Sequence, residues 1–202
     1  YTYDANGNIK TVLRNGSADD GTKLTGYIDN LTYKYYNNDK SNRLFAVGDA
    51  ASDDASRGDF YDYNSDGFGS NPELPEYNFD NNGNMILDGN KRLSLTYNIL
   101  NLPKTTPRYG GGVGYYSYMA TGMKVCEKSY NSSNLQTTID YIGPFVYKNG
   151  ALDYIITSEG RAVYSAGAFT YEYNIEDHLG NVRIVFKEMY LAASLLQRNN
   201  YY

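Results

Sequence analysis

The chain has one cysteine, Cys126, and one histidine, His178, among its 202 residues. One cysteine cannot form an internal disulfide, and one residue of each kind is too little for a Cys/His zinc cluster or a Cys–His catalytic pair. Cys126 lies in a β-pattern and is predicted to be a small buried side chain. Because adjacent side chains in a strand or tight turn point in different directions, we interpret Asp177 and His178 as part of a structural turn.

Several other features are missing or scarce. No apolar stretch approaches the length that crosses a bilayer. The net charge of −5 argues against a nucleic-acid partner, because phosphate binding needs a basic surface. The glycine-rich stretch 110–114 lacks the Lys-Ser/Thr pair of a phosphate loop, so we interpret it as a flexible connection between strands. No spacing singles out a catalytic pair of carboxylates. The chain is therefore predicted not to be an enzyme.

Tyrosine and glycine, in contrast, are abundant, with 24 and 20 residues. Tyrosine and β-branched residues suit a pleated, half-buried surface, while helix formers are thinly spread. Glycine, asparagine and aspartate supply the turns that many short strands require. We therefore predict an all-β fold of repeated antiparallel hairpins.

A pair of aromatic or apolar residues followed by a turn recurs along the chain. The turns Asn6-Gly7-Asn8 and Asn82-Gly83-Asn84 are nearly identical, and the interval from Phe79 to Tyr97 is similar to that from Tyr97 to Tyr118. Such a period predicts one strand-turn-strand unit that stacks on itself. The recurring segments are residues 1–4, 31–35, 77–80, 95–98 and 116–119.

The stretch 171–186 has the same design in a longer form. Tyr171 and Tyr173 share one strand face, and Ile184 and Phe186 occupy alternate positions of the following strand. Gly180 supplies the permissive backbone between the two strands. We predict a hairpin here.

These motifs together resemble the Rhs (rearrangement hotspot) or YD-repeat family. Tyr-Thr-Tyr-Asp-Ala-Asn-Gly-Asn-Ile at 1–9 and Tyr-Asn-Phe-Asp-Asn-Asn-Gly-Asn-Met at 77–85 are similar to its tyrosine–aspartate repeat. The stretch 140–162 resembles the late part of the Rhs core, and Asp-His-Leu-Gly-Asn-Val-Arg at 177–183 matches the block that precedes the end of that core. The resemblance covers nearly the whole chain.

The resemblance implies a β-sheet ribbon that spirals into a hollow shell. In the family this shell encloses a C-terminal toxin, or lies in a secreted or cell-surface bacterial protein used in contact-dependent competition. The expected partners are the remainder of the same polypeptide, its C-terminal effector domain and secretion machinery. The family's self-cleavage boundary and its toxin are expected to lie beyond residue 202.

The domain organisation follows from the same comparison. We expect residues 1–202 to be a single core fragment of a longer protein, since the chain opens in mid-strand without an initiator methionine, signal peptide or anchor. An insertion rich in Asp, Ser, Gly and Asn spans 49–74. Residues 188–200 are expected to form a short helix or a linker, because Leu191 and Leu195 are spaced for one helix face. The alternative is that this stretch forms one more strand.

The insertion contains a pattern typical of calcium-binding loops. Acidic or amide side chains stand at its first, third and fifth positions, glycine follows at the sixth, and an acid closes it at the twelfth. The alternative is a solvated acidic loop, because Gly69 replaces an apolar residue and no helix flanks the loop. Both interpretations stay open, and the chain has no other predicted cofactor. The calcium ligands would be Asp62, Asn64, Asp66, the Phe68 carbonyl and Glu73.

The sequence thus predicts a structural shell segment that encapsulates or displays a downstream effector domain. The alternative is a cell-surface adhesion or carbohydrate-binding module, because tyrosine-rich β-surfaces can stack against sugar rings.

Overall fold

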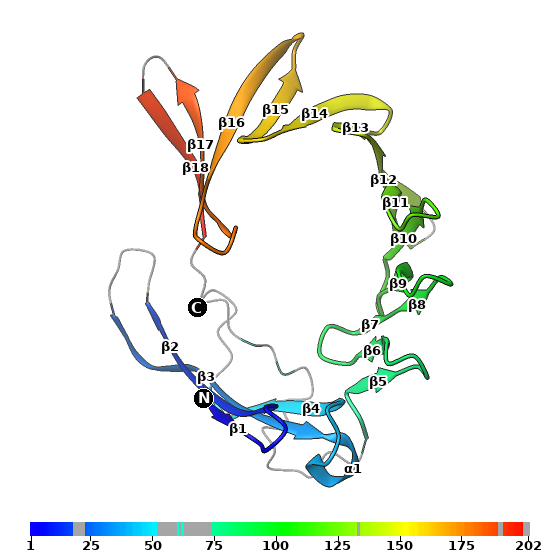
Figure 1. Ribbon diagram of the computed structural model, residues 1–202, viewed down its shortest axis with the longest axis vertical. Coiled ribbons are helices and arrows are strands. Elements are labelled where there is room, and N and C mark those ends of the chain that lie inside the picture. Colours follow the sequence, from blue (N-terminus) through cyan, green and yellow to red (C-terminus); the bar gives the residue numbers. More distant parts are fainter. Residues whose placement is uncertain are drawn as a thin grey trace. The chain divides into compact units, whose positions relative to one another are not determined.

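The computed structural model describes residues 1–17, 23–51, 60, 62, 74–132, 134–189 and 192–199. These residues are almost entirely β, and neighbouring strands pair antiparallel (Figure 1). The predicted all-β class and its repeated hairpins are confirmed. The chain divides into two compact units, Tyr1–Gly111 and Gly112–Tyr202. The prediction of a single core fragment stays a prediction.

The first unit contains two small sheets and one further hairpin. The strands follow one another in chain order within each sheet, as expected when successive hairpins are added one after another. The first sheet is made of β1 (Thr2–Tyr3), β2 (Ile9–Ser17), β3 (Lys23–Tyr35) and β4 (Leu44–Asp49); the second of β5 (Tyr77–Phe79), β6 (Met85–Asp88) and β7 (Leu93–Ser94); and the hairpin of β8 (Thr96–Tyr97) and β9 (Pro103–Pro107).

The core of the first unit lies around Val12, Leu31, Val47 and Tyr77. Val12 and Leu31 are directly opposite each other in β2 and β3, so their side chains share one face of the sheet. Burial of each aliphatic side chain contributes about 1.5–3 kcal/mol. This cluster therefore holds the first sheet and β5 together.

The helical turn α1 (Tyr36–Asp39) connects β3 to β4. Asn37, Asn38 and Asp39 all have positive φ, between 53° and 62°, so this turn is left-handed. Asparagine and aspartate tolerate that conformation better than most other residues. The Asp39 carboxylate stabilises the turn by accepting the Tyr35 N–H at 2.7 Å.

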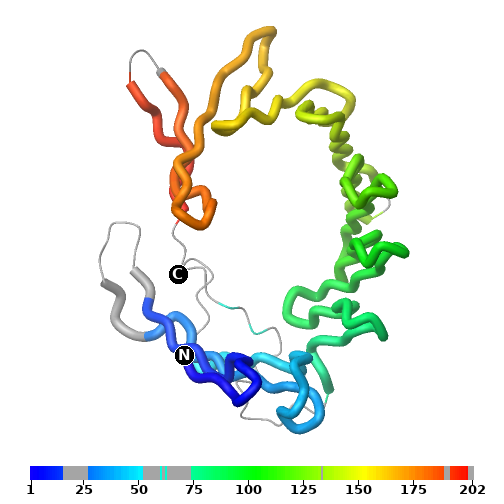
Figure 2. The backbone as a smooth tube through the Cα atoms, viewed as in Figure 1, coloured from blue at the N-terminus to red at the C-terminus, as the bar shows by residue number. Residues whose placement is uncertain are grey.

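The second unit is a succession of hairpins in which each strand pairs with the next (Figures 1 and 2). Asn149-Gly150 and Ala166-Gly167 form two-residue turns, and all four residues have positive φ, as type I′ turns require. The strands are β10 (Val113–Tyr118), β11 (Lys124–Asn131), β12 (Asn134–Ile142), β13 (Phe145–Lys148), β14 (Ala151–Thr157), β15 (Gly160–Ser165), β16 (Ala168–Glu176), β17 (Val182–Met189) and β18 (Ala192–Arg198).

Of the alternatives left open for 188–200, the strand is the one observed. β18 pairs antiparallel with β17, from Ile184 opposite Arg198 to Met189 opposite Ala192, with a register shift between Val185 and Phe186. The helix suggested by the leucine spacing is therefore wrong. The open edge of β17 offers a row of backbone hydrogen-bonding groups, and this tertiary context outweighs a weak local helix preference.

The prediction that Cys126 is a buried side chain is wrong, because the side chain is half-buried. It lies in β11 opposite Ser117 and Asp140. Among the described residues of this unit, the buried apolar side chains are those of Val146 and Ala162. They are few because the sheet is a single layer with little to cover it. Desolvation, together with the neighbouring Asp140, raises the pKa of the Cys126 thiol.

Candidate functional site

One five-residue turn recurs in both units. The N–H of its first residue donates to the carbonyl of its fifth at 2.9 Å in every copy. Its fourth residue has positive φ, from 58° at Asn101 to 88° at Gly122, which favours glycine or asparagine there. The five copies are residues 4–8, 80–84, 98–102, 119–123 and 177–181.

In three copies an aspartate at the first position holds the turn together. Asp80 Oδ1 accepts the N–H groups of Asn82 at 2.9 Å and Asn84 at 2.8 Å, and its Oδ2 accepts Asn84 Nδ2 at 2.9 Å. Asp4 and Asp177 make the corresponding bonds. The carboxylate thus satisfies donors that the tight turn leaves unpaired.

The same hydrogen bonds lower the pKa of these aspartates. The Asn84 side chain is the main cause at Asp80, and the Asn181 side chain is the main cause at Asp177. At Asp4 desolvation raises the pKa, but the hydrogen bonds from Asn8 and Asn6 outweigh it and lower the pKa overall. Bonds to the charged form stabilise it.

Each of these hairpins also has a β-bulge at the same place. Tyr3 is opposite Ile9 while Thr2 is opposite Thr11, so Lys10 is the extra residue. Equivalent shifts occur before the other four turns. The residue at the shift is aromatic in four copies, namely Tyr3, Phe79, Tyr97 and Tyr118.

The tyrosines connect one repeat to the preceding one. The Tyr97 hydroxyl donates to the Met85 carbonyl at 2.6 Å, and the Tyr35 hydroxyl donates to the Ile9 carbonyl at 2.7 Å. Ile9 and Met85 hold the same position, directly after a repeated turn. A tyrosine ring can thus pack while its hydroxyl reaches a polar partner, which phenylalanine cannot do.

Asparagine side chains connect neighbouring turns in the same way. Asn101 Oδ1 accepts Nδ2 of Asn82 at 3.0 Å and of Asn84 at 2.9 Å. Asn101 therefore replaces the glycine of the other copies without losing the turn, and it adds a bond between repeats.

The two faces of the sheet in the second unit differ in chemistry. Directly paired residues lie on the same face. On one face Tyr173 stacks on Phe186 and Tyr164 packs against Phe169, with ring centroids 5.5 Å and 5.0 Å apart. Phe169 and Tyr171 are 45% and 54% exposed there, so we call this the aromatic face.

The opposite face of this sheet carries charged pairs. Arg161 donates to Glu172 at 2.6 Å and lies over the Tyr154 ring. Lys124 pairs with Glu127 at 2.8 Å and lies near the ring of Tyr141. Half-exposed rings such as Phe169 and Tyr171 thus lie on one side, whereas the charged pairs, together with the Tyr154 and Tyr141 rings that they contact, lie on the other.

The predicted calcium loop lies mostly outside the described residues. Asp62 is described and is 2% exposed, and its Oδ2 accepts the Asp49 N–H at 3.4 Å. Asp49 Oδ2 is buried without a hydrogen-bond partner. No cluster of three or more His, Cys, Asp or Glu side chains that could hold a metal occurs among the described residues. Asn64, Asp66, Phe68 and Glu73 lie outside the described residues, so calcium binding stays a prediction.

The other predicted features occupy turns and connections. His178 is exposed at the second position of the turn 177–181. Gly110, Gly111 and Gly112 have positive φ and lie between β9 and β10. Among the described residues no helix is long and apolar enough to cross a membrane.

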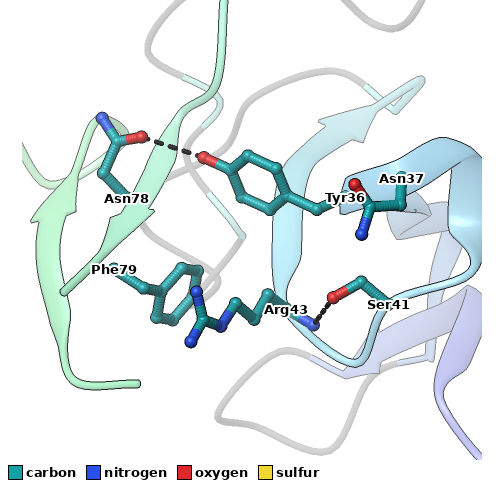
Figure 3. Close-up of a pocket in the computed structure, with 6 residues that line it drawn as sticks. All are labelled: Tyr36, Asn37, Ser41, Arg43, Asn78 and Phe79. Atoms are coloured by element: carbon teal, nitrogen blue, oxygen red, sulfur yellow. Dashed lines mark hydrogen bonds between the residues drawn. The ribbon is translucent and has the colours of Figure 1, made fainter. Parts of the chain in front are cut away.

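A pocket of about 320 Å³ opens in the first unit (Figure 3). It lies between the β3–β4 connection and β5. The sequence analysis missed it, because no short motif marks a pocket whose sides come from segments far apart in the chain. Its lining residues are Tyr36, Asn37, Ser41, Arg43, Asn78 and Phe79.

No protein-family model and no curated protein matches the chain. Solved structures do match. A chain of the Photorhabdus luminescens Tc holotoxin pore with a TccC3 mutation is 15% identical, with a TM-score of 0.62, over 100% of this chain and 9% of that one. A chain in the crystal structure of TcdB2-TccC3-TEV is 16% identical, with a TM-score of 0.56, over 100% of this chain and 12% of that one.

The chain therefore has the fold of these Tc toxin chains. The Rhs-like fold that the sequence resemblance implied is thereby confirmed. The repeated turn is the local unit of this fold in the present chain. The chain spans only a small part of the length of the structures it matches.

Proposed function

We propose that this chain is a wall segment of an Rhs-like shell and that its aromatic face contacts an enclosed polypeptide. The observation that carries the proposal is that half-exposed rings such as Phe169 and Tyr171 lie on one face of the sheet in the second unit, whereas the ion pairs of Arg161 and Lys124 lie on the other. A single-layer sheet leaves aromatic rings such as Phe169 and Tyr171 half exposed. A large exposed apolar surface favours association with a further apolar layer.

The fold shared with Tc toxin chains supports the structural role. In this proposal the segment is not an enzyme, and the longer protein is secreted or lies on the bacterial cell surface. The enclosed polypeptide is a C-terminal effector of the same chain, used in competition between bacteria. Each repeat forms part of the shell wall, because hydrogen bonds from tyrosine and asparagine side chains join it to the preceding repeat.

The test is limited proteolysis of the full-length native polypeptide, followed by mass spectrometry. We expect a segment outside residues 1–202 to resist protease until the shell is denatured. Phe169→Lys should expose that segment, whereas Thr170→Lys, on the opposite face of the same strand, should not. Equal protease sensitivity in both variants and in the wild type would refute an enclosed segment on this face.

The second candidate is a carbohydrate-binding adhesion module, for which half-exposed rings such as Tyr171 offer stacking surfaces. A glycan array separates the two functions, because a shell wall has no reason to select particular sugars along this face.

A further inference from the structure

The pocket in the first unit has a pre-organised wall. The Tyr36 hydroxyl lies 2.7 Å from the Tyr77 carbonyl and 2.9 Å from Asn78 Oδ1, and its single proton is shared between these two acceptors. Its ring packs edge-on against Phe45 at 5.1 Å and Phe79 at 6.4 Å. The position of Tyr36 is therefore set by the protein before any ligand arrives, which lowers the entropic cost of binding.

The pocket offers a positive charge that the described protein groups do not neutralise. Arg43 is exposed, and its guanidinium forms no ion pair in the part of the chain that the structure describes. Figure 3 shows it among the residues that line the pocket. The Asp39 carboxylate, which does not line this pocket, accepts the Tyr35 N–H at 2.7 Å and lies 4.0 Å from Lys10.

The remaining lining groups are uncharged and polar. The Ser41 hydroxyl accepts the Arg43 backbone N–H at 3.0 Å and keeps its own proton to donate. Asn78 uses Oδ1 for Tyr36, which leaves its Nδ2 donor, and Asn37 adds a second exposed amide. None of the six lining residues is acidic, although the chain carries a net charge of −5. The pocket is therefore rich in donors and complementary to an anion.

We propose that this pocket binds an acidic sugar, with the carboxylate of a hexuronate on Arg43. The planar guanidinium fork matches a carboxylate in a bidentate arrangement. The hydroxyl of Ser41 and the amides of Asn37 and Asn78 would bind ring hydroxyls, which a simple carboxylate lacks. A volume of about 320 Å³ is at the lower end for small-ligand sites and suits one sugar ring. This site is independent of whether the second unit contacts an enclosed polypeptide.

The test titrates galacturonate into the 202-residue chain and follows heat and amide chemical shifts. Galactose lacks the carboxylate and acetate lacks the ring, so both should bind at least tenfold more weakly. Arg43→Gln should weaken galacturonate binding at least tenfold, and Arg43→Lys should weaken it less, because it keeps the charge but loses the fork. Arg108→Gln, which removes an exposed arginine outside the pocket, should leave the affinity unchanged.

The proposal is overturned if galacturonate produces neither heat nor shifts at Asn37, Ser41 and Asn78. Equal binding of acetate would show a simple anion site and refute the sugar, and equal binding of galactose would refute the role of the carboxylate. An unchanged affinity in Arg43→Gln would place any binding elsewhere. The thermal unfolding midpoint of each variant shows that it is folded before it is titrated.

Discussion

At the scale of single residues, the aspartate that opens the repeated turn does more than its position in the tyrosine–aspartate motif shows. Its carboxylate accepts two backbone N–H groups and one side-chain amide within five residues. The turn at Asn98 is a natural variant, because asparagine keeps the two backbone bonds and leucine replaces the last asparagine.

Substitution of Asp80 is expected to separate these contributions. Asp80→Ala removes all three acceptor bonds and should lower the thermal unfolding midpoint clearly. Asp80→Asn keeps an acceptor for the backbone N–H groups, as Asn98 does, and should lower the midpoint less. Thermal unfolding, monitored by circular dichroism, gives the midpoints of the wild type and the two variants. A midpoint for Asp80→Ala equal to that of the wild type would show that the hairpin does not need this carboxylate.

The lowered pKa values of Asp4, Asp80 and Asp177 predict a dependence of stability on pH. Because their pKa is lower in the folded than in the unfolded chain, their contribution is present above the unfolded value, about 3.9. It is lost as the pH falls through the folded values. We expect urea midpoints to be level from pH 7 to 5 and to fall towards pH 3.

The matched comparison is the triple variant D4N, D80N, D177N. It should show a smaller fall between pH 5 and pH 3, because asparagine does not titrate. An identical fall in the variant and the wild type would assign the acid sensitivity to other carboxylates, such as Asp29, which pairs with Arg14.

At the scale of elements, the pairing of β15 with β16 depends on Gly160. This residue has a φ of +149°, and a Cβ placed on it would lie 2.2 Å from the Glu172 carbonyl oxygen. No side chain fits at such a distance without movement of the strands. Gly160, in the stretch 140–162 that resembles the Rhs core, is therefore required by a close approach of two backbones.

Gly160→Ala is expected to destabilise the chain by roughly 1–3 kcal/mol, as in other overpacked sites. Urea unfolding gives the free energy, and hydrogen exchange should show weaker protection in β15 and β16. Gly167→Asn is the control, because Gly167 has positive φ but open space around it and asparagine tolerates that backbone. Similar losses of unfolding free energy in the two variants would mean that backbone strain, rather than the steric clash with Glu172, causes the destabilisation.

The loop that begins at Asp62 has its own test. If it binds calcium, CaCl₂ should raise the unfolding midpoint and release or absorb heat on titration, and Asp66→Asn should remove both effects. Asp153→Asn in β14 serves as the control and should respond like the wild type. Absence of heat and of any midpoint change would leave an acidic loop without a metal, and Asp62 would then act through its bond to Asp49.

At the scale of the whole molecule, the second unit is a single sheet with few buried residues, and its stability comes from cross-strand pairs. The stacked rings of Tyr173 and Phe186 join β16 to β17, and the ion pair of Arg161 and Glu172 joins β15 to β16 on the opposite face. Such pairs contribute about 0.2–1 kcal/mol each. Many small contributions of this kind suit a repeated structure, in which each hairpin depends on its neighbours.

Much of this architecture could be predicted from local residues. Asn149-Gly150 and the asparagine–glycine turns at 6–8 and 82–84 force tight reversals, because few other residues tolerate positive φ. The spacing of Phe79, Tyr97 and Tyr118 predicted a repeated hairpin, and the alternation of Tyr171 and Tyr173 predicted a shared face. These features are determined within a few residues of chain, so the sequence by itself decided the all-β class and the unit of repetition.

Tertiary structure decided what depends on distant neighbours. The edge of β17 made a strand of Ala192–Arg198, although local leucine spacing suggested a helix. The single-layer sheet left Cys126 half-buried, because no second layer covers it. The pocket around Arg43 combines the β3–β4 connection with β5, and only folding brings these segments together. Local propensity acts over a few residues, whereas burial and binding sites depend on contacts across the fold.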